Sequence, residues 1–429
     1  MRILMLAQFY HPILGGIEQH VRTLSHELVA RGHDVSVATM RHKDQAAFEM
    51  DQGVRIHRVR SSVQRLPWLF SNSGRQYPPP FPDPEIMLDL HHVLEKERPE
   101  IVHAHNWLVR SFLPLKTRSK ARLVVTLHDY NYVCARVDLM HYGNPCSGPG
   151  IAKCLSCASN HYGPVRGVPT VLSNWAMNLF VHGTVDRFIA VSQSVATGNR
   201  LASSRVPFLV IPNFMADDPG LAEGDVAPYL AQLPTEEFLL FVGGLSRVKG
   251  VEVLLRAYAG LRNAPPLVLI GYPTPDWPFP GLKNLENVIV LKDWPHYAVM
   301  AAWERCTLAL IPSIWRDPCP TVAMEAMYMS RPVIASRIGG LIDIVVDGET
   351  GLLVSPDDPQ ALQDAIQGLL EDPSRQEYMG TMAKRRVEMF QAHTVVPRIE
   401  QVYHEVVNTN AVETVEARKI LSNVNARRG

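Results

Sequence analysis

Short apolar runs and longer amphipathic segments alternate along the first half of the chain. The apolar runs lie at residues 3–8, 35–40, 101–105, 123–127 and 188–191. Short runs of this kind predict buried strands, whereas apolar residues repeated every three to four positions predict helices. The segment after the first run has this helical spacing at Ile17, Val21, Leu24 and Leu28, and Gly32 is typical of a helix C-cap. Alternating strands and helices predict a parallel, doubly wound sheet.

The same pattern restarts in the second half. Further short apolar runs lie at residues 238–242, 267–270, 288–291, 308–311 and 333–335. A chain of 429 residues is too long for one ordinary hydrophobic core, so two domains are expected. We predict an α/β protein with Rossmann-like domains at residues 1–207 and 208–385, followed by a C-terminal helix and tail at 386–429.

Charge and hydropathy exclude several classes of protein. Lys and Arg total 42, as do Asp and Glu, so no basic field indicates nucleic acid as a partner. No apolar run reaches the length of a membrane span, and the N-terminal residues resemble a strand rather than a signal peptide. We therefore expect a cytoplasmic protein without a transmembrane segment. Peripheral contact with the inner membrane face stays open.

Two carboxylates eight residues apart, Asp317 and Glu325, follow the strand predicted at 308–311. A Pro-rich turn carries the first, and a short helix carries the second near its start. In open α/β sheets, ligands bind at the carboxyl ends of the strands. Ionised carboxylates accept strong hydrogen bonds from hydroxyl groups, so this pair indicates a ligand rich in hydroxyls. The alternative for Glu325 is a charge that complements the helix dipole.

A Gly-bearing turn connects the strand at 238–242 to the next helix and contains Arg247 and Lys249. Backbone N–H groups at a helix start favour a bound phosphate. Cations at this end oppose the helix dipole, which makes an ordinary solvated pair the weaker interpretation. Gly15 and Gly16 form a similar turn in the first half, where paired glycines permit close approach of a ligand but equally suit a structural turn.

The acid pair has seven residues between its two members, and the turn before it carries two cations. In these two features the chain resembles the family 4 retaining glycosyltransferases of the GT-B fold. The resemblance implies two Rossmann-like domains facing across a cleft, with the C-terminal segment crossing back to the first. In that family the first acid lies by the hydroxyls of the donor sugar and the second binds the ribose diol. These roles fall to Asp317 and Glu325. The first acid is usually Glu before a Gly-rich turn, whereas here Asp precedes Pro-Cys-Pro.

The resemblance also implies roles for other residues. Arg247 and Lys249 would hold the donor diphosphate and stabilise its charge as it leaves. His128 would orient the donor sugar near its anomeric carbon. The implied catalytic residues are thus His128, Arg247, Lys249 and Asp317. The implied donor-binding residues are Arg247, Lys249 and Asp317 together with Gly15, Gly16, Lys292 and Glu325. Lys292 is expected to lie near the nucleobase.

Acceptor contacts are implied for the first domain. Tyr10 and His11 lie beside the Gly15 turn, and His105 and Asp129 lie at predicted strand ends. Asp129 is also expected to hold the tautomer of His128. The alternative for each is an ordinary packing role.

The implied reaction moves a sugar from a nucleotide sugar, with UDP the commonest carrier, to the hydroxyl of a small molecule, glycan or lipid-linked acceptor. No carboxylate of the motif set is an obvious nucleophile, so the resemblance favours a retaining front-face substitution without a metal cofactor. A non-catalytic nucleotide-sugar-binding or partner subunit is the alternative, because Asp317 departs from the usual Glu. A dehydrogenase is disfavoured, since the first turn lacks G-x-G-x-x-G.

Four cysteines crowd into an insert at residues 134–157. They are Cys134, Cys146, Cys154 and Cys157. In a cytosolic protein such a cluster indicates metal before disulfides, and C-x2-C is half of a tetrahedral zinc site. Structural zinc that braces the acceptor loop, reduced buried thiols, and disulfides all stay open.

Overall fold

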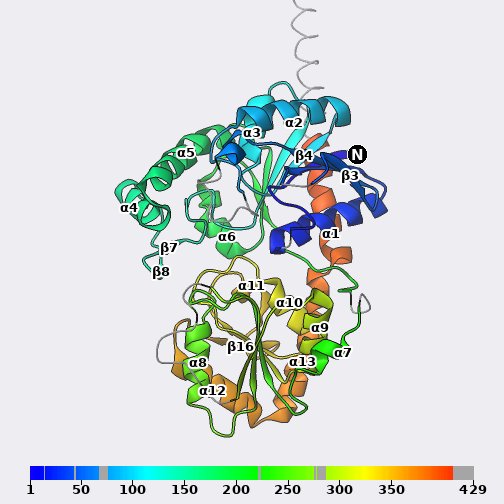
Figure 1. Ribbon diagram of the computed structural model, residues 1–429. Coiled ribbons are helices and arrows are strands. Elements are labelled where there is room, and N and C mark those ends of the chain that lie inside the picture. Colours follow the sequence, from blue (N-terminus) through cyan, green and yellow to red (C-terminus); the bar gives the residue numbers. More distant parts are fainter. Residues whose placement is uncertain are drawn as a thin grey trace, which may run out of the picture.

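The computed structural model describes residues 1–13, 15–42, 45–66, 76–220, 224–274, 277 and 287–408 (Figure 1). They form two α/β domains, one above the other in Figure 1, each with a central sheet and helices on both faces. The prediction of two parallel, doubly wound domains is confirmed. No helix within the described part of the chain is long and apolar enough to cross a membrane.

The first domain contains an eight-stranded sheet in the order β10-β9-β6-β5-β1-β2-β4-β3. All neighbouring strands are parallel except β3 and β4. Most strands are apolar and buried on both faces, as parallel sheets covered by helices require. The strands are β1 (Arg2–Leu6), β2 (Asp34–Met40), β3 (Phe48–Asp51), β4 (Val54–Val59), β5 (Ile101–Ala104), β6 (Arg122–Leu127), β9 (Arg187–Ala190) and β10 (Phe208–Val210).

Helices cover both faces of this sheet, and a helical hairpin of α4 and α5 follows β6 on one side of the domain (Figure 1). The Asp83 carboxylate caps α2 by accepting from the backbone N–H groups of Glu85 and Ile86. The α-helices are α1 (Gly16–Ala30), α2 (Pro84–Glu97), α3 (Val109–Phe112), α4 (Ile151–Tyr162), α5 (Pro164–His182) and α6 (Gln193–Gly198). Shorter elements are η1 (Ser62–Arg65), η3 (Leu113–Leu115), η4 (Leu201–Ser203), β7 (Met140–His141) and β8 (Asn144–Pro145).

The second domain contains a six-stranded parallel sheet in the order β13-β12-β11-β14-β15-β16. Its strands are β11 (Leu239–Val242), β12 (Leu267–Ile270), β13 (Val288–Leu291), β14 (Leu308–Ile311), β15 (Val333–Ser336) and β16 (Gly351–Val354). Its helices are α7 (Ala227–Leu230), α8 (Val251–Ala259), α9 (His296–Arg305), α10 (Thr321–Tyr328), α11 (Leu341–Ile344), α12 (Pro359–Leu370), α13 (Pro373–Val387) and η5 (Glu388–Phe390).

Strands β3, β4, β10 and β16 lie outside the predicted apolar runs. β4 has no continuous apolar pattern because it contains Arg55 and His57, which both bond to Glu97 of α2. The predicted boundary between residues 207 and 208 is wrong by a few residues, because β10 pairs with β9 and therefore completes the first sheet.

The chain crosses back to the first domain near its end. Residues 392–408 form a helix that packs on the first sheet, while α13 remains on the second domain against α10 (Figure 1). Its apolar residues share one core with residues of β1 and α1; they include Val395, Ile399, Val402, Tyr403 and Val406. The predicted tail beyond residue 408 lies outside the described residues.

A buried polar contact joins this final helix to the first sheet. The imidazole of His103 on β5 lies between two hydroxyls, with Nδ1 2.7 Å from Tyr403 Oη and Nε2 2.7 Å from Thr126 Oγ1. Burial lowers the pKa of His103 to about 3, well below its ordinary value. The folded protein therefore holds this ring neutral.

We expect the protein to lose stability as the pH falls below about 6.5, the ordinary pKa of histidine. In that range the unfolded chain binds a proton at His103 that the folded chain does not, so the free energy of unfolding rises with pH. The slope contributed by His103 approaches about 1.4 kcal/mol per pH unit. Denaturant unfolding at several pH values between 5 and 6.5 should show a flatter profile for His103→Gln than for the unmodified chain. Parallel profiles would contradict the assignment.

Candidate functional site

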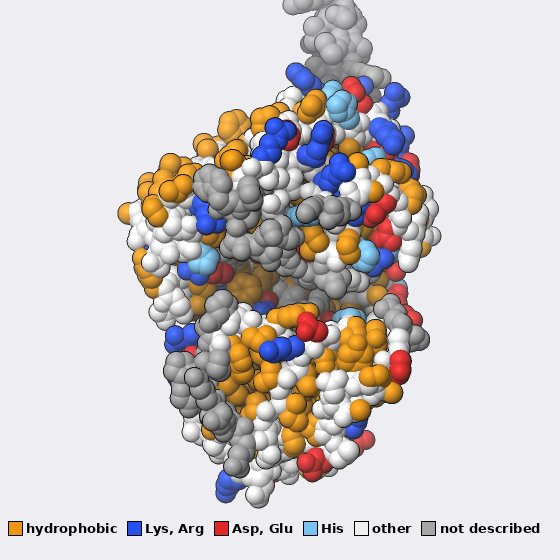
Figure 2. Space-filling model, in the orientation of Figure 1, with side chains coloured by type: hydrophobic (Ala, Val, Ile, Leu, Met, Phe, Trp, Pro, Cys, Tyr) orange, Lys and Arg blue, Asp and Glu red, His pale blue; other side chains and the backbone are white. Residues whose placement is uncertain are grey.

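The carboxyl ends of the strands in the two sheets supply the residues of the candidate site. In the first domain, β1, β5 and β6 are neighbours and lead to the loops with Tyr10, His105 and His128. In the second domain, β11 and β14 are neighbours and lead to the loops with Lys249 and Asp317. A hollow separates the two domains in the space-filling view (Figure 2).

The turn between β11 and α8 brings Lys249 beside the loop that follows β14. Gly250 is the N-cap of α8 with φ 76°, in the left-handed region that favours glycine. A Cβ atom at this position would lie 1.7 Å from the carbonyl oxygen of Pro312. The backbone N–H of Ile314 also donates to the carbonyl of Val248 over 3.0 Å. Glycine is therefore required for the two loops to meet.

Lys249 and Asp317 form an ion pair at this junction. The ammonium of Lys249 donates to Asp317 Oδ2 and lies 5.3 Å from the centre of the Trp315 ring. Asp317 is only 5 % exposed, so its charge depends on this cation. The family resemblance implies that the two residues contact different groups of the donor, and the structure shows that they also bind one another.

A third loop fixes the backbone of Asp317. The N–H of Gly340, after β15, donates to the Asp317 carbonyl over 2.7 Å. Gly339 has φ 64°, and a Cβ atom there would lie 2.4 Å from the same carbonyl oxygen. The carboxylate is thus presented by a turn that is held from two sides.

Arg247 and Lys292 lie at the rim of the second domain. The Arg247 side chain is largely exposed at the start of α8, with Nε 3.3 Å from Glu252 Oε2. Lys292 is exposed directly after the edge strand β13. Their positions leave both cations accessible to an anionic or nucleotide ligand.

Glu325 is the fifth residue of α10 rather than its first, so the helix-start interpretation is wrong. Its carboxylate is nearly buried, with Trp303 Nε1 and His296 Nε2, both of α9, each 3.4 Å away. Contacts of 3.4 Å are weak hydrogen bonds. The oxygens of Glu325 therefore retain capacity for a stronger donor, such as the hydroxyls of a diol.

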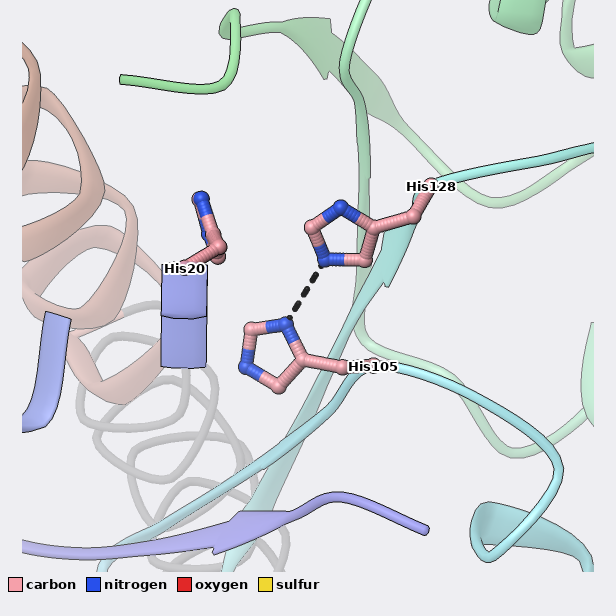
Figure 3. Close-up of side chains that lie close together, drawn as sticks. All are labelled: His20, His105 and His128. Atoms are coloured by element: carbon pink, nitrogen blue, oxygen red, sulfur yellow. Dashed lines mark hydrogen bonds between the residues drawn. The ribbon is translucent and has the colours of Figure 1, made fainter. Parts of the chain in front are cut away.

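Three histidines lie close together at the carboxyl ends of β5 and β6 in the first domain. His20 comes from α1, while His105 and His128 follow β5 and β6, and their rings point toward one another (Figure 3). His105 Nδ1 lies 3.0 Å from His128 Nε2. The ring centres of His20 and His128 are 4.8 Å apart. One ring nitrogen from each of the three residues can be chosen so that all three lie within 4.8 Å of one another.

Burial keeps these rings neutral. It lowers the pKa of His128 to about 4 and the pKa values of His20 and His105 well below their ordinary value. Both ring nitrogens of His20 and Nε2 of His105 are buried without a hydrogen-bond partner among the described residues. Neutral imidazoles with unused nitrogens can bind the hydroxyl groups of a sugar.

Asn213, in the segment joining the domains, holds the orientation of His128. Its Oδ1 lies 3.1 Å from His128 Nδ1, and its Nδ2 donates to the Cys319 carbonyl of the second domain over 3.3 Å. The expectation that Asp129 holds the His128 tautomer is therefore wrong. The carboxylate of Asp129 instead accepts from the backbone N–H of Asn131 over 2.7 Å. Burial raises the pKa of Asp129 to about 7.

Two further contacts join the domains beside the acid pair. The hydroxyl of Tyr130 donates to the Arg316 carbonyl over 2.9 Å, next to Asp317. The backbone N–H of Gln193 donates to Asp343 Oδ2 over 2.7 Å. The loops after β6 and β9 in the first domain thus lie directly against the loops after β14 and β15 in the second.

The remaining residues expected at the acceptor are placed differently. Tyr10 is buried and its hydroxyl donates to Asp51 Oδ2 over 3.1 Å, so this hydroxyl has an internal partner. His11 is exposed. Gly16 begins α1 with open space around its Cα, whereas a Cβ atom at Gly15 would meet the Glu18 carboxylate at 2.1 Å. The Glu18 carboxylate therefore lies against Gly15 at the start of α1.

The cysteine insert does not assemble a zinc tetrahedron in the described structure. No three ligand atoms of Cys134, Cys146, Cys154 and Cys157 gather within 4.8 Å, and all four are free thiols. Burial raises the pKa of Cys134 to about 11, and Cys157 is also buried. This arrangement agrees with the reduced-thiol alternative, and zinc stays a prediction.

Within the described part of the chain, His20, His105 and His128 are the set that could hold a metal ion. Neutral imidazoles are the ligand form, but His105 and His128 would have to give up their mutual hydrogen bond. The proposed reaction does not depend on an ion at these residues.

His20, Asn213 and Tyr130 are site residues that sequence reasoning missed. His20 lies on the inner face of α1, four residues after Gly16, at helical spacing that would have placed it beside the turn. Asn213 and Tyr130 act through contacts across the two domains, for which local spacing holds no signal.

Comparison with known proteins identifies both halves of the chain. Residues 14–217 match the family model "Glycosyltransferase Family 4", and residues 230–386 match "Glycosyl transferases group 1". Glycogen synthase of Mycobacterium tuberculosis H37Rv is 28% identical over 435 residues, which cover 94% of each chain. D-inositol 3-phosphate glycosyltransferase of Corynebacterium diphtheriae is 33% identical over 178 residues, covering 38% of this chain and 42% of the relative.

Solved structures show the same fold. Sucrose-phosphate synthase from Thermosynechococcus elongatus has a TM-score of 0.71 at 20% identity, covering 95% of this chain and 99% of its own. Anabaena HepE in complex with UDP and glucose has a TM-score of 0.66 at 18% identity, covering 94% and 99%. The two domain matches, the GT-B architecture and the loop residues at the cleft agree. The chain belongs to the family 4 glycosyltransferases of the GT-B fold, which use a nucleotide sugar as donor.

Proposed function

We propose that this protein transfers a hexosyl or related unit from a UDP-sugar to an acceptor hydroxyl, with retention of anomeric configuration and without a metal ion. The observation that carries this proposal is the position of Lys249. Its ammonium lies at the start of α8, beside Asp317 and on the same sheet edge as Glu325. One cation can therefore contact a diphosphate while the two carboxylates contact hydroxyls on either side of it.

The charges of the second domain suit a leaving diphosphate. Arg247 and Lys249 precede a helix whose N-terminal dipole also favours an anion. Fixed positive charge aimed at an oxygen that becomes negative stabilises the transition state more than the ground state. These residues can thus do for the diphosphate what a divalent cation does in other transferases.

The first domain supplies a neutral wall opposite these charges. His128 and His105 are held unprotonated by burial, so they add no charge next to the anomeric carbon. A sugar hydroxyl that bound His128 would replace one of its two present partners, Asn213 or His105. In a front-face substitution the leaving phosphate oxygen takes the acceptor proton. Such a step needs positioning and charge stabilisation rather than a protein nucleophile. UDP as the carrier is supported by the HepE complex with UDP-glucose.

One contact favours the alternative of a non-catalytic nucleotide-sugar-binding subunit. Asp317 already binds Lys249, so a diphosphate would have to share or displace that ion pair. Binding and turnover must therefore be measured separately.

The proposal is tested with a panel of UDP-, ADP- and GDP-sugars in the presence of excess EDTA. We expect release of free UDP, to water or to added acceptors, and a first-formed product whose NMR coupling shows the donor's anomeric configuration. An inverted product would contradict retention, and restoration of activity by Mg²⁺ alone would contradict metal independence. Tight donor binding without any UDP release would favour the non-catalytic alternative.

Lys249→Ala should lower turnover by about 100-fold or more, because a cation aimed at developing charge contributes several kcal/mol to the transition state. The variant also leaves Asp317 buried without its partner, so the melting temperature should fall and rates should be measured well below it. The double variant Lys249→Ala/Asp317→Asn should recover stability but not turnover.

Arg256→Ala is a matched control, since Arg256 is an exposed cation paired with Glu252 on the same helix. It should retain normal turnover. Recovery of turnover in the double variant would show that Lys249 only neutralises Asp317.

Glu325→Gln should weaken donor binding by about 1.5 to 3 kcal/mol, because it replaces a charged acceptor oxygen with an amide of the same size. Calorimetric titration with the donor measures this change. Glu304→Gln on the exposed side of α9 is the control and should bind the donor normally. Unchanged affinity of Glu325→Gln would limit Glu325 to its contacts with Trp303 and His296.

A further inference from the structure

Helix α5 carries a continuous apolar stripe on its outer face. Leu179 is 79% exposed, Val165 is 73% exposed and Phe180 is 63% exposed, the three highest values in this stripe. The stripe follows the helical period and comprises Val165, Pro169, Leu172, Trp175, Ala176, Leu179 and Phe180. Apolar side chains gather on this side of the first domain in Figure 2. A surface helix normally presents charged and polar residues there.

Polar contacts on the inner face hold this orientation. The Asn174 side chain is buried and accepts a hydrogen bond from the guanidinium of Arg110. Ser173 Oγ donates to the Pro80 carbonyl, and Asn178 Nδ2 donates to the Tyr132 carbonyl. The inner face also buries Val171, Met177 and Val181, so α5 presents apolar side chains on both faces, and buried hydrogen bonds fix which of them faces outward.

The helix cannot readily turn its apolar stripe inward. Gly167 lies where α5 meets α4, and a Cβ atom there would lie 2.5 Å from the backbone of Ala158. This close approach fixes the rotation of α5 against α4. The stripe is thus a built feature of the helical hairpin.

The hairpin itself carries no acidic residue. Residues 139–185 contain no Asp or Glu, but they contain Lys153 and Arg166. Arg118 and Lys120 are exposed in the turn before β6, and Lys116 of that turn lies 3.3 Å from Asp186, just after α5. Basic side chains are therefore found at both ends of the hairpin.

Two further exposed aromatic residues lie beside the hairpin. Phe81 is exposed and follows Pro80, the residue bonded to Ser173. Tyr142 is exposed in the turn between β7 and β8, with its hydroxyl 3.0 Å from Ser156 Oγ on α4. Aromatic residues at the border of an apolar surface are typical of contact with the interface of a bilayer.

We propose that the α4–α5 hairpin docks on the surface of an anionic lipid bilayer, with α5 lying in the plane of the interface. Its apolar stripe would enter the boundary between headgroups and acyl chains, and the basic residues would face anionic headgroups. The absence of acidic side chains over 47 consecutive residues favours this partner, because such a surface repels no anionic lipid. The inference goes beyond the proposed function and rests on the surface alone.

Co-sedimentation with vesicles tests the proposal without any donor or acceptor. The protein should bind vesicles of phosphatidylcholine with phosphatidylglycerol, bind pure phosphatidylcholine far more weakly, and lose affinity for the anionic vesicles as salt is added. The triple variant Leu172→Ser/Leu179→Ser/Phe180→Ser should bind anionic vesicles at least tenfold more weakly. Ile342→Ser is the matched control, because Ile342 is an exposed apolar residue of the second domain.

Equal vesicle binding by the triple variant and the unmodified chain would overturn the proposal, as would no binding of the unmodified chain. If the unmodified chain instead forms a dimer in light scattering that the triple variant loses, the stripe is an interface with a second copy and the proposal is wrong. UDP binding measured without lipid shows separately whether the variant keeps its donor site. Failure of the proposed transferase function would therefore leave the vesicle result unaffected.

Discussion

The two connections between the domains are joined by one backbone pairing, which holds the domains in place together with the side-chain contacts across the cleft. Met215 of the outgoing segment donates its N–H to the Phe390 carbonyl over 3.0 Å, and its own carbonyl accepts from the N–H of Ala392 over 3.0 Å. The chain thus passes between the domains twice at the same place. The returning helix then buries its apolar face on the first sheet, so the pairing is secured by a hydrophobic core. This arrangement directs the carboxyl ends of both sheets toward one cleft.

The two walls of that cleft differ in charge for a physical reason. In the second domain, loops rich in glycine and proline present Lys249, Asp317 and Arg247 at the edge of the sheet. In the first domain, His20, His105 and His128 lie so deep that burial keeps them neutral. Asn213 links the two walls through His128 and the Cys319 carbonyl. A domain movement that changed this linker would therefore change the orientation of His128 directly.

The first domain combines two unusual distributions of polarity. Its interior holds uncharged imidazoles at the cleft, and the outer face of α5 presents apolar side chains to the surroundings. Burial favours the neutral form of the imidazoles, and Asn213 holds the orientation of His128. Buried hydrogen bonds to Arg110, Pro80 and Tyr132 hold the orientation of α5. Substrate chemistry and surface recognition are therefore carried by separate parts of one domain.

The sequence by itself determined the two doubly wound sheets and the acid and cation motifs, because strand burial and loop position follow from local spacing. Residues 267–270 and 308–311 form strands as predicted, since each is a short apolar run buried on both faces. The sequence did not reveal β4, because its polar residues Arg55 and His57 find their partner, Glu97, on a helix about 40 residues later in the chain. Only the tertiary structure decided that Lys249 binds Asp317 and that Asn213 rather than Asp129 orients His128. It also decided that the apolar stripe of α5 faces outward. Each of these depends on contacts between segments far apart in the chain, and local spacing contains no record of such contacts.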